Sequence, residues 1–236
     1  MAKIPVLLIP GTLNTGRVWA AQSAGLAPLA EIYIADVTTQ DSTAAMAEDA
    51  LRAMPPRFAL AGFSLGGYVA LEILRRAPER VAGLALISTS ARAEPQEALA
   101  GRQKSIDLAR RDFTRLLAGM RPFMLSPVNL DNPALNAALD AMMREVGADA
   151  FARQSQAVMG RADSRALLPT ITCPTLLVCG RDDKVTPPRF SEEIAAAVPG
   201  AVLELLDQVG HLSPMEAPER ITDLLKAWLQ RVNLQQ

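Results

Sequence analysis

Hydrophobic positions follow two patterns that alternate along the first part of the chain. Short, continuous apolar runs are separated by longer stretches in which apolar residues recur with helical spacing. The first pattern is typical of buried strands and the second of amphipathic helices, so their alternation predicts a parallel sheet covered on both faces. The predicted strands are Val6–Ile9, Glu31–Asp36, Phe58–Ala61 and Val81–Ser88, and the predicted helices begin at Val18, at Ser42 or Thr43, and at Tyr68.

The alternation stops between about Ala91 and Arg165, where only the helical spacing continues. This segment is rich in methionine, an unbranched side chain that adapts to its surroundings. Its methionines either fill gaps in the core or form an adaptable wall for an apolar ligand, and both interpretations stay open. The predicted helices contain Leu99–Met120, Leu135–Val146 with Asp131 as N-cap, and Phe151–Met159, and the methionines are Met120, Met124, Met142, Met143 and Met159.

Beyond Arg165 the alternation of strand and helix returns. An interrupted parallel sheet of this kind is one folding unit with an insertion and not two independent domains. We therefore expect a core of residues 1–90 and 166–236 and a helical lid of residues 91–165 lying over the sheet. The predicted elements after the lid are the strands Thr175–Val178 and Val202–Leu206 and the helices Phe190–Val198 and Ile221–Val232.

The sequence Gly62-Phe63-Ser64-Leu65-Gly66 lies between the third predicted strand and the helix after it. A strand that becomes a helix within a few residues makes a sharp turn, and larger residues beside the serine would collide with neighbouring backbone. The turn places the Ser64 hydroxyl at a helix N-terminus, where unpaired N–H groups favour negative charge. Gly-x-Ser-x-Gly also occurs in ordinary tight turns, but a strand before it and a helix after it favour a nucleophile.

A serine hydroxyl needs a base to remove its proton as it attacks, and near neutral pH that base is usually histidine. The one histidine of the chain, His211, follows the last predicted strand, at the same sheet edge as Ser64. The imidazole in turn needs an acceptor that fixes its tautomer. Asp182 and Asp183, which follow the Thr175–Val178 strand, both lie at this edge, and at most one of them is expected to serve.

Acyl transfer also needs backbone donors directed at the negative charge that develops on the carbonyl oxygen. The N–H of Leu65, directly after the candidate nucleophile, is one expected donor. The second is expected from the turn after the first strand, where Thr12 is preferred and Leu13 is the reserve. Pro10, in the same turn, has no N–H to donate.

Composition excludes several classes of function. The 236 residues have a formal net charge of −1, with acids and bases spread along the chain, so neither nucleic acid nor a membrane surface is an expected partner. No apolar run approaches a membrane span, and the apolar start, broken by Pro5, is too short for a signal peptide. Cys173 and Cys179 bracket one strand, too far apart for a disulfide, and with one histidine they do not suggest a zinc site. Free thiols and a cytoplasmic location are expected.

These features resemble the α/β-hydrolase superfamily, and the resemblance runs nearly from end to end. It rests on the turn Gly62–Gly67, on the order serine, acid, histidine, and on the segment Gly210–Glu219, which is similar to the family's Gly-His loop with its downstream Glu and Pro. The family's acid usually follows a Gly-x-x-Asp pattern, which implies Asp183 rather than Asp182. The implied fold class is α/β, with a mostly parallel sheet and a helical lid inserted after the fourth strand.

Two features depart from the family. Many relatives carry His-Gly where this chain has Pro10-Gly11, so the oxyanion loop is expected to be held differently. The chain also starts at the strand before that loop, so the family's opening pair of strands is expected to be absent and the sheet to have about six strands.

The resemblance implies a serine hydrolase that cleaves a small-molecule carboxylic ester, or a related activated carbonyl, through an acyl-enzyme. The same scaffold supports hydrolysis of carbon–carbon bonds and lactones, and a lyase or synthase that uses Ser64 and His211 as a base is the main enzymatic alternative. A catalytically silent ligand-binding protein is the alternative of another class. No cofactor is expected. The substrate, with an apolar part, is expected to contact Trp19, Phe63, Met124 and, through a carboxylate, Arg121. Arg121 and the following Pro122-Phe123-Met124 are expected to lie in a loop.

Overall fold

The computed structural model describes residues 3–233 and contains a sheet of six strands in the order β2-β1-β3-β4-β5-β6, in which every neighbouring pair is parallel. The three strands β3, β4 and β5 are buried along their whole length, as expected for a parallel sheet with covered faces. The predicted α/β class and the expected number of strands are therefore confirmed. The strands are β1 (Ile4–Ile9), β2 (Ala30–Ile34), β3 (Phe58–Phe63), β4 (Val81–Ile87), β5 (Thr175–Gly180) and β6 (Val202–Leu206).

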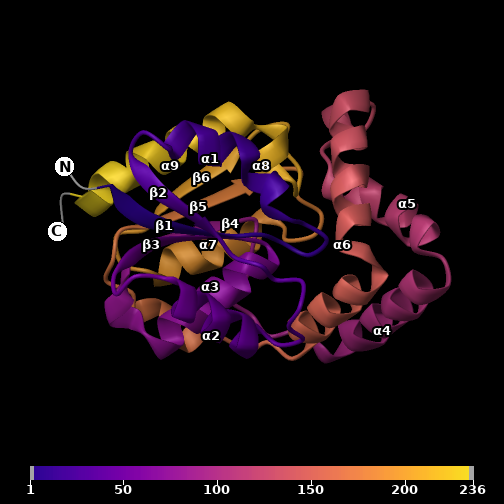
Figure 1. Cartoon of the computed structure of the whole chain (residues 1–236), viewed down its shortest axis with the longest axis horizontal. Helices are drawn as coiled ribbons and strands as arrows, with labels where there is room; N and C mark the ends of the chain where they lie inside the picture. The colour runs from indigo at the N-terminus through magenta and orange to yellow at the C-terminus, as the bar shows by residue number, and fades with distance from the viewer. Residues whose placement is uncertain (1–2, 234–236) are drawn as a thin grey trace.

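Helices cover both faces of this sheet, with α1, α8 and α9 on one face and α2, α3 and α7 on the other (Figure 1). Side chains of consecutive strand residues point to opposite faces, so Leu8 joins the first core cluster and Ile9 the second. The helices are α1 (Ala20–Leu26), α2 (Thr43–Ala53), α3 (Leu65–Arg76), α7 (Pro188–Ala197), α8 (Ser213–Glu216) and α9 (Pro218–Asn233), with short 3₁₀ turns at Gly16–Trp19, Pro78–Arg80, Pro127–Asn129 and Arg165–Thr170.

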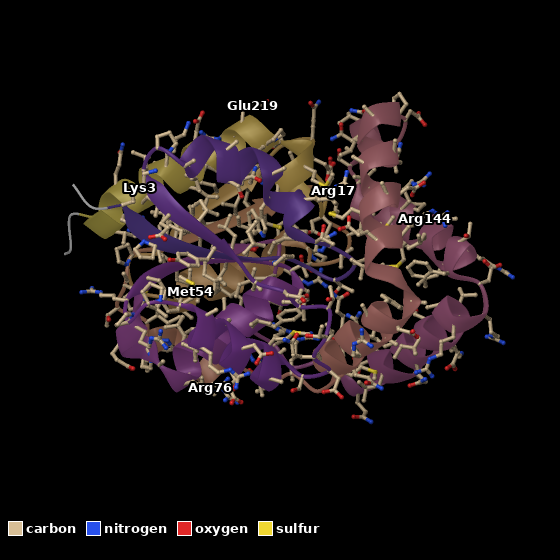
Figure 2. The ribbon with its side chains drawn as sticks, viewed as in Figure 1. Lys3, Arg17, Met54, Arg76, Arg144 and Glu219 are labelled. Atoms are coloured by element: carbon tan, nitrogen blue, oxygen red, sulfur yellow. The ribbon has the colours of Figure 1, made fainter. Side chains whose placement is uncertain are left out.

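Three further helices, α4 (Gln96–Arg111), α5 (Phe113–Met124) and α6 (Pro133–Met159), come between β4 and β5 and lie together at one side of the sheet (Figure 1). They meet the rest of the molecule at loops that follow the strands. Arg17, which lies in the segment after β1 and is labelled in Figure 2, pairs with Glu145 of α6 at 3.4 Å. The backbone N–H of Leu212, after β6, donates to the carbonyl of Met124 at 3.0 Å. The helices therefore border the carboxyl ends of the strands.

Some details of these helices differ from the sequence predictions. Asn132, and not Asp131, is the N-cap of α6, where its side chain accepts a hydrogen bond from the N–H of Leu135 at 3.1 Å. The predicted loop at Arg121 is instead the last turn of α5, which tolerates Pro122. The two predicted helices after residue 133 form one element that is broken at Gly147, whose φ of 78° is open to glycine.

Within residues 3–233, no helix is both long enough and apolar enough to cross a membrane.

Candidate active site

Ser64 lies at the apex of the turn from β3 to α3. Its φ of 53° and ψ of −114° form a strained conformation for a residue with a side chain. Gly62 and Gly66 permit the turn, because a Cβ on either residue would collide with a backbone carbonyl. The Ser64 N–H donates to the carbonyl of Ile87 at 3.0 Å, and the Thr89 hydroxyl donates to the Ser64 carbonyl at 2.8 Å. These contacts hold the backbone of Ser64 in place.

Ser64, His211 and Asp183 lie in a continuous chain of hydrogen bonds. His211 Nε2 is 3.0 Å from Ser64 Oγ, and His211 Nδ1 is 2.9 Å from Asp183 Oδ2. The three residues follow β3, β6 and β5 respectively, and all three are buried. An imidazole that donates from Nδ1 to a carboxylate leaves Nε2 free to accept a proton from the hydroxyl. The structure thus brings together the serine, histidine and aspartate that the sequence singled out.

Asp183 is the aspartate beside His211, and its neighbours hold the carboxylate in place. Oδ1 accepts the N–H groups of Val185 and Thr186 at 2.9 and 2.8 Å, and Oδ2 accepts the Thr186 hydroxyl at 2.8 Å. Burial by itself would raise the pKa of Asp183, but the charge of His211 and the hydrogen bonds from His211 and Thr186 outweigh burial and lower that pKa. The Asp183 carboxylate is therefore charged at neutral pH. The side chain of Asp182 makes no hydrogen bond to another described residue.

The loop that carries His211 is anchored by a residue to which the sequence analysis assigned no role. Glu216 accepts the Gly210 N–H through Oε1 at 3.0 Å and the Ser126 N–H through Oε2 at 2.8 Å, and Oε2 also accepts from Asn129 Nδ2 at 3.0 Å. Glu216 thus ties the histidine loop to the segment that follows α5. The sequence signal for this role was the glutamate just downstream of Gly-His. Ser126 and Asn129, which it binds, are distant in the chain, so the role could not be read from the local sequence.

The turn after β1 carries the second expected oxyanion donor. The N–H of Asn14 donates to the carbonyl of Gly11 at 3.2 Å, so Thr12 and Leu13 are the two central residues of this turn. The Leu13 N–H donates to Gln154 Oε1 at 2.9 Å, so the reserve donor already has a partner. Neither Thr12 nor Leu65 donates its N–H to a side chain or to a loop carbonyl within residues 3–233. Both N–H groups are therefore open to a ligand.

Gln154 of α6 holds this turn, and the sequence analysis missed it. Leu13 has a φ of 59°, a conformation that the third residue of such a turn needs and that normally favours glycine. The Gln154 side chain is fully buried, and it accepts the Leu13 N–H while its Nε2 donates to the carbonyl of Val37 at 3.1 Å. Gln154, which belongs to the inserted helix α6, thus supports the strained turn after β1. This chain has Pro10 at the position where many relatives have His, so the turn is held by a different residue here.

A cavity of about 440 Å³ opens at Ser64 and is lined by Thr12 and His211 as well as by side chains of α4, α5 and α6. The methionines of the insertion divide between the two interpretations. Met120 and Met124 line the cavity, whereas Met142 and Met143 are fully buried in the core. The wall of the cavity therefore includes both sulfur-containing and aliphatic side chains.

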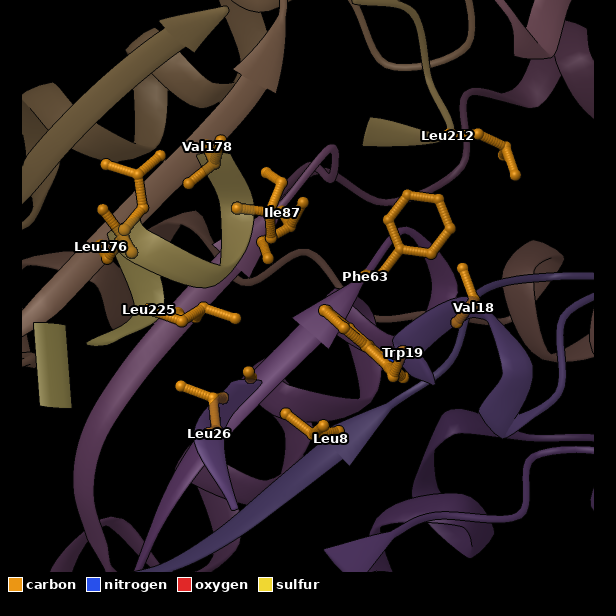
Figure 3. Close-up of a cluster of buried hydrophobic side chains, with 14 of the residues drawn as sticks. Leu8, Val18, Trp19, Leu26, Phe63, Ile87, Leu176, Val178, Leu212 and Leu225 are labelled. Carbon is orange, nitrogen blue, oxygen red and sulfur yellow. The ribbon is translucent and has the colours of Figure 1, made fainter. Parts of the chain in front are cut away.

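Three of the four expected substrate contacts lie outside this lining. Trp19 is fully buried against Phe63, with ring centroids 6.4 Å apart and an edge-to-face angle of 87° (Figure 3). Phe63 in turn packs on His211, with centroids 5.2 Å apart, so both aromatic rings support the site from the core. Arg121 pairs with Asp140 at 2.5 Å instead of facing the cavity. Among the residues that the structure describes, Met124 is the expected contact that does line it.

The charged side chains in the lining are paired with each other. Glu94 bonds Arg102 at 2.5 Å and also pairs with the buried Arg161, whose guanidinium lies 4.3 Å from the ring of Tyr68. Burial would raise the pKa of Glu94, but the two arginines lower it overall. Across residues 3–233, no group of three or more His, Cys, Asp and Glu side chains is placed to hold a metal ion.

Cys179 lies beside the aspartate of the site, with Sγ 3.9 Å from Asp183 Oδ2, and both cysteines are free. Burial and the neighbouring carboxylate raise the pKa of Cys179 to about 12. Only the thiolate is nucleophilic, so Cys179 is expected not to react with a disulfide reagent such as DTNB at pH 8 in the folded protein and to react once guanidinium unfolds it. A Cys173→Ser variant isolates the signal, and rapid reaction in the native state would contradict this prediction.

A protein-family model described as "Alpha/beta hydrolase family" matches residues 6–224. A curated relative from Neisseria meningitidis serogroup A, a pimeloyl-(acyl-carrier protein) methyl ester esterase, is 27% identical over 180 residues, which cover 72% of this chain and 56% of that relative. The chain thus spans little more than half of that relative's length. A provisionally named carbamate hydrolase from Rhizobium rhizogenes is 28% identical over 247 residues, covering 95% of this chain and 92% of the relative.

The fold is also that of a solved enzyme. A thermophilic esterase from Thermogutta terrifontis, determined with malate bound, superposes with a TM-score of 0.90 at 28% sequence identity, covering 98% of this chain and 91% of the esterase. The match of the family model over nearly the whole chain agrees with the parallel sheet and with the turn at Ser64. The chain therefore belongs to the alpha/beta hydrolase family.

Proposed function

We propose that this protein is a serine hydrolase that cleaves carboxylic esters of small molecules through an acyl-enzyme. The observation that carries the proposal is the hydrogen-bonded chain from Ser64 through His211 to Asp183, which opens into a cavity of about 440 Å³. Two of the similar proteins described above are named as esterases, which supports the same class of reaction.

In the first half of the reaction, Ser64 Oγ attacks the ester carbonyl carbon and gives its proton to His211 Nε2. Asp183 stabilises the imidazolium that forms, and the N–H groups of Leu65 and Thr12 stabilise the oxyanion. The C–O bond to the alcohol then breaks, and the alcohol leaves with the proton from His211. In the second half, water attacks the acyl-enzyme, His211 takes its proton, and the acid leaves as Ser64 recovers its hydrogen.

The helices of residues 91–165 are proposed to act as a lid over the core of residues 1–90 and 166–236. Several residues of the lid, among them Met124 and Phe151, line the cavity at Ser64. A wall of this kind sets the size and polarity of the substrate and limits water around the reacting ester.

The test is hydrolysis of p-nitrophenyl esters of increasing acyl length, with labelling by a fluorophosphonate that reacts with activated serines. We expect release of p-nitrophenol, covalent labelling of Ser64, and a preferred acyl length set by the cavity. Absence of both turnover and labelling would overturn the proposal. A lyase or a silent binding protein on this fold would then be the explanation to pursue.

Replacing Gln154 by Leu, which is similar in size, tests whether this side chain positions the oxyanion turn. Loss of its hydrogen bond to Leu13 is expected to lower kcat by about tenfold to a hundredfold, because a misplaced donor stabilises the transition state less. KM should change much less. Gln156→Leu, an exposed change on the same helix, is the matched control. An unchanged kcat in folded Gln154→Leu, with thermal unfolding as the check of folding, would contradict this role.

A further inference from the structure

An arginine and a tyrosine in the lining of the Ser64 cavity keep hydrogen-bond donors unpaired among residues 3–233. Arg102 donates from Nε to Glu94, but its two terminal nitrogens donate to no other described residue. The Tyr68 hydroxyl likewise has no partner within this part of the chain. The Arg102 side chain is 34% exposed and Tyr68 is only partly buried, so a ligand in the cavity can reach both.

Arg102 and Tyr68 lie close together because Glu94 and Arg161 connect them. Glu94 accepts from Arg102 through Oε1 at 2.5 Å and from Arg161 through Oε2. The guanidinium carbon of Arg161 lies 4.3 Å from the centre of the Tyr68 ring. A second cavity, of about 430 Å³, adjoins the first, and Tyr68, Glu94 and Arg102 line both. The unpaired donors therefore lie where the two cavities meet.

The charge that this network presents to the cavity is positive. Burial alone would raise the pKa of Glu94, but the two arginines lower it, so the carboxylate is charged at neutral pH. One carboxylate between two guanidiniums leaves one positive charge in excess. The side chains of Glu94 and Arg161 are 5% and 7% exposed, against 34% for Arg102, so the accessible member of the network is a cation.

The second cavity adds to this positive charge. Five basic and two acidic residues line it. Arg92 is neutralised by Glu193, which lies outside the lining, at 2.8 Å. Lys184 and Arg189 make no ion pair with another described residue. A cavity with an excess of one sign of charge raises the local concentration of ligands of the opposite sign, which here are anions.

The unpaired donors match a carboxylate. The two terminal nitrogens of a guanidinium can donate side by side to the two oxygens of a carboxylate. Burial raises the pKa of the Tyr68 hydroxyl, although the nearby arginines oppose it, so the hydroxyl is protonated at neutral pH and can donate as well. An alkyl group accepts from none of these donors, and a cationic group is repelled by Arg102.

Tyr68 also relates this network to the nucleophile. It follows Ser64 by four residues, which is about one turn of α3. Side chains on a helix lean toward its N-terminus, so the Tyr68 ring leans toward the turn that holds Ser64. An ester carbonyl at Ser64 and an anionic group at Tyr68 and Arg102 can therefore belong to the same small molecule.

We propose that Arg102 and Tyr68 form an anion subsite that binds a carboxylate of the substrate while the ester lies at Ser64. The inference rests on the proposed esterase function, and it names the substrate class: small esters that carry a second, free carboxylate. The apolar lid residues of the cavity, Met120 and Met124 among them, then contact the chain between the two groups.

The experiment compares esters that carry a carboxylate with esters that carry a carboxamide, which has nearly the same size and shape but no charge. One series has this group on the acid side: monomethyl succinate, glutarate and adipate with their amides. The other has it on the alcohol side: the acetyl esters of 3-hydroxypropanoate and 4-hydroxybutanoate with their amides. The carboxylate is expected to be favoured by about tenfold or more in kcat/KM in at least one series, as one charge-assisted hydrogen bond predicts.

Arg102→Gln and Tyr68→Phe should each reduce this preference, and added salt should reduce it in the parent protein. Arg110→Gln is the matched control, because Arg110 is exposed on the same helix, outside both linings, and the change removes the same charge. Both test variants are expected to fold: Tyr68→Phe removes one oxygen, and in Arg102→Gln the carboxylate of Glu94 keeps Arg161 as its partner. Their melting temperatures check this.

Failure of the subsite is distinguishable from failure of the esterase proposal. If carboxylate and carboxamide are hydrolysed equally well in both series, or if Arg102→Gln keeps the full preference, the anion subsite is wrong and the esterase proposal stands. If no ester is hydrolysed and fluorophosphonate does not label Ser64, the esterase proposal fails. Calorimetric titration with glutarate then decides on the subsite alone, because parent protein that binds no better than Arg102→Gln would overturn it.

Discussion

Replacing Ser64 with Ala is expected to lower kcat for p-nitrophenyl esters by about a millionfold, the scale of loss seen when a hydrolase loses its nucleophile. The Ser64 hydroxyl is the group that His211 Nε2 meets at 3.0 Å, and no alternative hydroxyl forms that contact within residues 3–233. Without it, the remaining oxyanion donors can at most assist direct attack by water. Residual ester hydrolysis is measured in stopped assays with long incubation. Loss of covalent labelling is measured by mass spectrometry after treatment with a fluorophosphonate.

The Ser64→Ala protein must be shown to fold, since the residue has a strained backbone. Alanine has the same backbone preference as serine at a φ of 53°, so the circular dichroism spectrum and the melting temperature are expected to stay close to those of the parent. A folded Ser64→Ala protein that still turns over esters at the parental rate would remove Ser64 from the mechanism.

Asp183→Asn is expected to lower kcat by about ten-thousandfold, by analogy with the same change in a serine protease triad. The carboxylate accepts from His211 Nδ1 at 2.9 Å, and its lowered pKa keeps it charged at neutral pH. An asparagine amide is nearly the same size but can donate to Nδ1, which favours the tautomer with the proton on Nε2. That imidazole cannot accept the proton of Ser64.

Asp182→Asn is the matched control for this change, because it alters the neighbouring aspartate in the same loop. The side chain of Asp182 makes no hydrogen bond to His211, so the loss in kcat is expected to be within a few fold. The two variants are compared by kcat at pH 7 to 8 under identical conditions. If Asp182→Asn lost more activity than Asp183→Asn, the assignment of the acid to Asp183 would be wrong.

The strands of the sheet were predictable because buried parallel strands are nearly continuous apolar runs. The start of the helix after Ser64 was harder to predict. The structure begins α3 at Leu65, whereas the sequence pattern predicted a start at Tyr68. Gly66 and Gly67 weaken a local helix signal, and packing against the sheet overrides it. Asp131 and Asn132 are adjacent capping residues, and the local signal for Asn132 was Pro133, because proline is favoured at the first helical position.

Substrate contacts were the least predictable part of the site. Trp19 is a large aromatic residue near a ligand-facing loop, yet its side chain is buried in the core, where it packs on Phe63. Arg121 was assigned to a loop and to a carboxylate ligand, but it belongs to a helix and pairs with Asp140. A side chain's direction depends on how the insertion packs, and no short stretch of sequence contains that information.

The sequence by itself determined the fold class, the strained turn at Ser64 and the candidate base, because these depend on local patterns and on the one histidine of the chain. The Gly-x-x-Asp pattern of the family already favoured Asp183 over Asp182, and the structure has Asp183 beside His211. Only the tertiary structure decided that Gln154 supports the turn at Leu13 and that Glu216 ties the histidine loop to the segment after α5. Leu13 and Gln154 are 141 residues apart in the chain. Such contacts arise when separate elements pack, so their donors and acceptors become partners only in the folded molecule.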